Sequence, residues 1–95
     1  MGSKNQQDLL KYLGVGYTLK TIDQELTIYR RINNHYDIEL SGASRKGHPI
    51  SVFVWDISNG EGASSRIVER HLDITDWDDL RALLEQLTEK YQGLA

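Results

Sequence analysis

The segment ISVFVWDI, residues 50–57, is apolar on both sides of the β-strand that it predicts. β-Branched and aromatic side chains favour an extended backbone, in which successive residues point to opposite faces. Its two faces are Ile50, Val52 and Val54 on one side, and Phe53, Trp55 and Ile57 on the other. A single antiparallel sheet under one helical layer normally alternates between apolar and polar residues. A strand of this kind needs cover on both faces.

The flanking residues predict an antiparallel meander around this strand. Residues 25–32 and 36–40 alternate between apolar and polar side chains, and the turn-forming residues 33–35 join them into a hairpin. Residues 67–74 predict a further strand, and residues 17–22 are the fifth candidate, so we expect four or five strands. Because the connections are short, each strand is expected to pair with its neighbour in sequence.

Helices are predicted at both ends of the chain. Residues 3–13 begin with a capping box formed by Ser3 and Gln6, and Gly14 follows them. Residues 75–93 carry an apolar stripe at helical spacing, formed by Trp77, Leu80, Leu84, Leu87 and Tyr91. The predicted fold is therefore α+β and a single domain over residues 1–95. It has a short N-terminal helix, a four- to five-stranded antiparallel meander sheet and a C-terminal amphipathic helix packed on one sheet face.

The glycine-rich stretch SNGEGASSR, residues 58–66, is interpreted as a hairpin end rather than a ligand-binding loop. A two-residue turn at its Asn-Gly pair would pair Ser58 with Glu61, Trp55 with Ser64, and Phe53 with Arg66. That register places Val68 on the Phe53 face and Ile67 on the Val52 face. One bulged residue reverses the assignment, and the poor strand formers in this stretch favour a bulge or a longer loop.

Composition excludes several functional classes. The net charge of −3 disfavours a general nucleic-acid-binding protein, and the absence of cysteine excludes disulfides and thiolate metal sites. No apolar run approaches the length of a membrane span or of a signal peptide, so we expect a soluble, cytoplasmic protein without membrane contact. The three histidines lack metal-site spacing, and no glycine pattern matches a cofactor loop. We therefore predict no enzyme activity, no metal and no cofactor.

Three kinds of cover fit the second face of residues 50–57: the N-terminal helix, another protein chain, or a ligand. We favour a small non-enzymatic binding or assembly module that forms a homodimer through a sheet face or edge. A further protein contact is expected at the basic loop, residues 45–48. The alternative is a protein that binds single-stranded nucleic acid by base stacking and phosphate contacts on the open face. The candidate surface residues for partner or nucleic acid are Tyr29, Arg31, Arg45, Lys46, Phe53, Trp55, Arg66 and Arg70.

Overall fold

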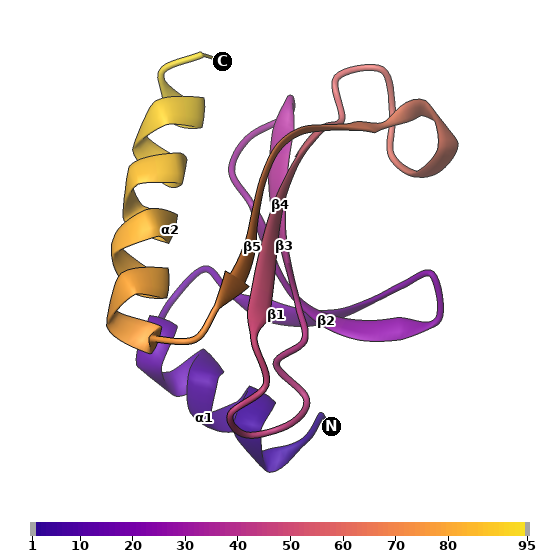
Figure 1. Cartoon of the computed structure of the whole chain (residues 1–95). Helices are drawn as coiled ribbons and strands as arrows, with labels where there is room; N and C mark the ends of the chain where they lie inside the picture. The colour runs from indigo at the N-terminus through magenta and orange to yellow at the C-terminus, as the bar shows by residue number, and fades with distance from the viewer. Residues whose placement is uncertain (1, 95) are drawn as a thin grey trace.

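A computed structural model describes residues 2–94 and confirms the predicted α+β fold (Figure 1). Its elements, in chain order, are α1 (Lys4–Leu13), β1 (Thr18–Ile22), β2 (Glu25–Arg31), β3 (Tyr36–Ser41), β4 (Ile50–Asp56), the short 3-10 helix η1 (Gly62–Ser64), β5 (Arg66–Ile74) and α2 (Trp77–Gln92). The five strands form one antiparallel meander in the order β1-β2-β3-β4-β5. The candidate segment 17–22 thus contains a strand, β1, and the sheet has five strands rather than four.

Both helices begin and end with the residues that the sequence predicts. The Ser3 side chain accepts a hydrogen bond from the backbone N–H of Gln6, and the Gln6 side chain accepts one from the backbone N–H of Ser3. Gly14, at the end of α1, has a φ of 86°, a conformation that glycine adopts without steric cost. At the start of α2, Asp76 accepts hydrogen bonds from the backbone N–H groups of Asp78 and Asp79.

The core lies between the helices and one face of the sheet. Its fully buried strand residues include Ile38, Leu40, Val52 and Val54, and its helix residues include Leu9, Leu80, Leu84, Leu87 and Tyr91. Leu9 of α1 belongs to the same core as the α2 residues, so both helices pack on the same side of the sheet (Figure 1). The rings of Tyr12 in α1 and Trp77 in α2 are in contact, with 5.7 Å between their centroids. The N-terminal helix therefore does not cover the second face of β4, which we call the open face.

The register between β4 and β5 is not that of a two-residue turn at the Asn-Gly pair, and the longer loop and bulge that the sequence favours form instead. Trp55 lies opposite Ile67 and Phe53 opposite Arg70, instead of Ser64 and Arg66. Residues 57–65 form a longer loop, in which the N–H of Gly60 donates to the carbonyl of Ile57 at 2.9 Å. The turn therefore centres on residues 58 and 59 rather than on the Asn-Gly pair, and η1 adds further residues. As a result, Ile67 shares the face of Trp55, the outcome expected for a bulge in this stretch rather than for a two-residue turn.

Two bulges interrupt the pairing of β5. Val54 lies opposite Glu69 while Trp55 lies opposite Ile67, so Val68 has no partner on β4. Near the end of the strand, Asp73 has a φ of 60°, and the register shifts again between Ile50 and Val52. Bulges bend an edge strand and spoil its regular hydrogen-bonding edge. The nine residues of β5 thus form a poor template for adding another strand.

Candidate functional site

The open face gathers five of the eight predicted surface residues. Tyr29, Arg31, Phe53, Trp55 and Arg70 all lie on this face, because they alternate with residues of the helix-covered core along β2, β4 and β5. The sequence-based grouping of these five residues therefore agrees with the strand register.

The other three predicted residues lie elsewhere. Arg66 pairs with Asp56 one position beyond Ile67, so it points to the opposite side of the sheet from Trp55, and its predicted place in the group is wrong. Arg45 and Lys46 belong to the exposed loop between β3 and β4, which contacts α1: Asn5 donates to the backbone carbonyls of Ala43 and Arg45. The basic loop and the open face are thus separate surfaces.

One half of the open face is an apolar strip, defined here as Phe53, Val68 and Leu72, which surround Arg70. Val68 and Leu72 lie two residues to either side of Arg70 on β5, and Phe53 lies opposite it on β4. Val68 is 41% exposed and Leu72 56% exposed, whereas Phe53 is partly buried. Large aliphatic side chains are therefore left in contact with water at the β5 edge of the face.

The other half is a cleft, which we call the acidic cleft. It has a volume of about 600 Å³. Its floor comes from β3 and β4, and its two walls come from β1 with the β1–β2 turn and from the β4–β5 loop, both of which project from the sheet away from α2 (Figure 1). Its charged residues are Lys20, Asp23, Asp37, Glu39 and Glu61, and its apolar residues include Ile22, Trp55, Ile57 and Ala63. Acidic side chains outnumber basic ones around it, so its electrostatic field is negative.

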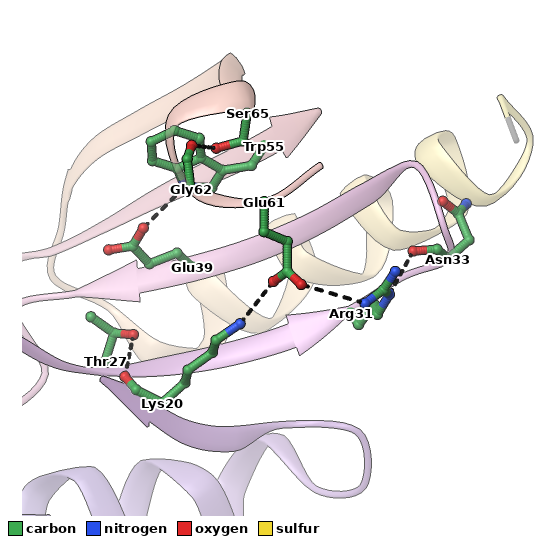
Figure 2. Close-up of polar contacts among 9 residues, drawn as sticks. All are labelled: Lys20, Thr27, Arg31, Asn33, Glu39, Trp55, Glu61, Gly62 and Ser65. Atoms are coloured by element: carbon green, nitrogen blue, oxygen red, sulfur yellow. Dashed lines mark hydrogen bonds and ion pairs between the residues drawn. The ribbon is translucent and has the colours of Figure 1, made fainter. Parts of the chain in front are cut away.

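Asp37 and Glu39 form the floor of the acidic cleft, and both are buried. Asp37 is 5% exposed and Glu39 9% exposed. The indole Nε1 of Trp55 donates a hydrogen bond of 3.0 Å to Oε1 of Glu39 (Figure 2). Burial raises the pKa of both carboxyl groups above their ordinary values, although this hydrogen bond partly opposes the rise at Glu39 and the Tyr29 hydroxyl partly opposes it at Asp37. The surroundings in the cleft therefore disfavour the charged forms of Asp37 and Glu39.

Glu61 fastens the β4–β5 loop to the first two strands. Its carboxylate lies 3.0 Å from Nζ of Lys20 and 3.9 Å from a guanidinium nitrogen of Arg31, and it sits between the two cations in Figure 2. The hydrogen bond from Lys20 is the main reason that the pKa of Glu61 is lowered. Because all three side chains are about half exposed, this bridge is weak and can open.

Sequence reasoning missed the burial of Asp37 and Glu39. Their alternation with Ile38 correctly predicts that both side chains point to the face opposite the core. From sequence alone, however, charged residues on that face are expected to be fully hydrated. The β1–β2 turn and the β4–β5 loop remove that water, and neither can be placed from sequence. The third acidic strand residue, Glu69, lies apart from them, because it is opposite Val54 and contacts α2 on the covered face.

No group of three or more histidine, aspartate or glutamate side chains within residues 2–94 is arranged to hold a metal ion. Over the same residues, neither helix has the length and apolar character needed to span a membrane.

No protein-family model matches the chain, and no curated protein or solved structure matches it significantly. What the chain does is therefore inferred from the geometry of its own residues.

Proposed function

We propose that the chain is a non-enzymatic binding and assembly module that forms a homodimer through the β5 half of its open face. The observation that carries this proposal is the apolar strip. Val68 and Leu72 alternate with Arg70 on one side of an edge strand, and no helix covers that side. Exposed aliphatic side chains that lie together on a rigid sheet commonly mark a protein contact, because their burial releases ordered water.

In this proposal the two copies meet through their open faces, and not by pairing the edges of their β5 strands. Dimers that continue a sheet need a straight strand with an uninterrupted row of N–H and C=O groups. The bulges at Val68 and Asp73 interrupt that row in β5. A face contact requires no backbone pairing, and it would bury the strip of each copy against the other copy.

Light scattering on a size-exclusion column tests the homodimer. We expect wild-type protein to show the mass of a dimer at high concentration, and a variant with both Val68→Ser and Leu72→Ser to show the mass of a monomer. Val15→Ser is the matched control, because Val15 is 99% exposed and lies in the loop between α1 and β1, outside the strip. A monomeric wild-type protein at millimolar concentration would exclude the proposal.

Single-stranded nucleic-acid binding is the second candidate, and it is favoured by the shared face of Tyr29, Phe53, Trp55, Arg31 and Arg70. Aromatic rings can stack on bases, and guanidinium groups can hold phosphates. Against it, the buried carboxylates of the cleft lie in the middle of this face, and Glu61 already pairs with Arg31.

Fluorescence anisotropy with a labelled oligothymidylate tests this second candidate. Binding would weaken as salt increases and would weaken further in Arg31→Ala and Arg70→Ala. No binding at low salt, or binding that neither substitution changes, would exclude it.

A further inference from the structure

The floor of the acidic cleft holds two buried carboxylates without a cationic partner. Across residues 2–94, no lysine, arginine or histidine nitrogen lies within 4.0 Å of Asp37 or Glu39. The two nearby cations, Lys20 and Arg31, form their ion pairs with Glu61, although their charges also oppose, from a distance, the rise that burial causes in the pKa of Asp37. Within residues 2–94, the only side-chain hydrogen bond to either carboxylate comes from the neutral indole of Trp55, which donates to Glu39.

Burial without an opposite charge is costly for a carboxylate. Buried charged groups are normally paired, because a neutral hydrogen bond replaces only part of the hydration that a carboxylate loses. Each carboxylate has two oxygen atoms and can accept several hydrogen bonds, and Trp55 donates to only one oxygen of Glu39. A cation that entered the cleft would therefore meet two largely buried carboxylates that have acceptor capacity to spare.

The cleft has the size and lining to admit such a group with its carbon chain. Its volume of about 600 Å³ is within the range of small-ligand pockets, roughly 300–1,000 Å³. Ile22, Ile57, Ala63 and the ring of Trp55 supply apolar surface along its walls. Arginine and lysine side chains bury their methylene chains against such surface, and indole rings attract cations.

We propose that the acidic cleft binds a guanidinium or primary ammonium group at the end of an aliphatic chain, with Asp37 and Glu39 as its acceptors. The cation lies between the two carboxylates and makes charge-assisted hydrogen bonds to them, and its methylene chain packs against the apolar walls. Glu61, on the loop above, turns from Lys20 to the ligand when the bridge opens. This site lies in the other half of the open face from the apolar strip and does not depend on the homodimer.

Titration with matched probes tests the ligand chemistry. The probes are agmatine, the capped peptide acetyl-Gly-Arg-Gly-amide, and the same peptide with citrulline, which has the shape of arginine but no charge. Binding is followed by calorimetry and by the NMR signal of the Trp55 indole N–H, which sits at the floor beside Glu39. We expect the arginine peptide or agmatine to bind and to shift this signal, and the citrulline peptide to do neither.

The two charged probes distinguish the source of the cation. Tighter binding of agmatine indicates a free amine as the natural ligand, and tighter binding of the arginine peptide indicates a side chain of a partner protein. Either result supports the site. The proposal is overturned if neither probe binds at millimolar concentration and low salt, or if the citrulline peptide binds as well as the arginine peptide.

Variants test the role of the two acceptors. Asp37→Asn with Glu39→Gln keeps the shapes and one acceptor oxygen on each side chain but removes both charges, so we expect the affinity for the charged probe to fall roughly tenfold or more. Glu85→Gln with Glu89→Gln is the matched control, because it removes two charges from exposed positions on α2, on the other side of the sheet. Equal affinity in the cleft variant and the control would overturn the proposal, and thermal melting of both variants verifies that they fold.

Discussion

The carboxyl groups on the two faces of the sheet have pKa values shifted in opposite directions. On the covered face, Glu69 lies 2.8 Å from Nζ of Lys90, and it accepts a hydrogen bond of 2.7 Å from the Tyr91 hydroxyl. The hydrogen bond from Lys90 is the largest cause that lowers the pKa of Glu69, to about 2. On the open face, Asp37 and Glu39 are more deeply buried, and their pKa values are raised.

The contrast shows that depth and partner act together: burial raises the pKa of Asp37 and Glu39, whereas the contact with Lys90 lowers the pKa of the less buried Glu69. Helix α2 brings its own cation to Glu69, because Lys90 and Tyr91 lie in its last turn. The open face has no helix, and the loop that closes over it brings Glu61, which carries the same charge as the floor. The covered face thus supplies a cation in contact with its carboxylate, while on the open face no cation of residues 2–94 lies within 4.0 Å of Asp37 or Glu39.

The largest expected effect is on the free energy of unfolding, and it differs between apolar residues of the covered face and those of the open face. Leu84→Ala should lower the free energy of unfolding by about 2–5 kcal/mol, because Leu84 is 2% exposed and its loss leaves a cavity. Leu72→Ala, on the apolar strip, should change monomer stability by less than about 0.5 kcal/mol. Urea denaturation at two protein concentrations measures both. A change below about 0.5 kcal/mol for Leu84→Ala would mean that α2 is not docked on the sheet.

A smaller effect is expected at the paired carboxylate. Glu69→Gln should lower the free energy of unfolding by about 1 kcal/mol at neutral pH, because water screens part of its attraction to the exposed Lys90. A lowered pKa stabilises the folded state above the ordinary value of 4.5, and this contribution is lost as the pH falls toward 2. Denaturation curves at several pH values should therefore converge for wild type and Glu69→Gln in acid. A difference that stays constant with pH would contradict this origin.

The smallest expected effect has the opposite sign and belongs to the cleft. Since the pKa values of Asp37 and Glu39 are raised, the folded state binds protons more tightly than the unfolded state, and stability falls as the pH rises above 3.8 to 4.5. Asp37→Asn with Glu39→Gln should therefore stabilise the protein at neutral pH, by about 0.5 kcal/mol, and should lose this advantage in acid. Thermal melting across this pH range measures it. A destabilised variant at neutral pH would show that the charges are already compensated.

The order of elements and the core were predictable because their signals are periodic and local. The spacing of Leu80, Leu84 and Leu87 marks the buried stripe of α2, and the alternation around Ile38 and Leu40 marks the inner face of β3. A residue that follows such a pattern can be placed without knowing any distant contact.

The site was only partly predictable because it depends on turns whose geometry the sequence does not specify. Asp23 and Gln24 form the tight β1–β2 turn with φ values of 50° and 67°, although neither is the glycine that usually marks such a turn. The bulge at Val68 changes the register by one residue, and this decides where Ile67 points. The acidic cleft arises where that turn and the β4–β5 loop meet over Asp37 and Glu39, so its depth is a tertiary property.

The meander order of the sheet also bears on how fast the chain reaches its native state. Every strand pairs with the one next to it in sequence, so the loops that must close during folding are short. Topologies of this kind have low contact order among sheet proteins and reach the native state comparatively quickly. Hairpins can form one after another as the chain lengthens, and the apolar inner face of the sheet is covered once α2, which follows β5, docks on it.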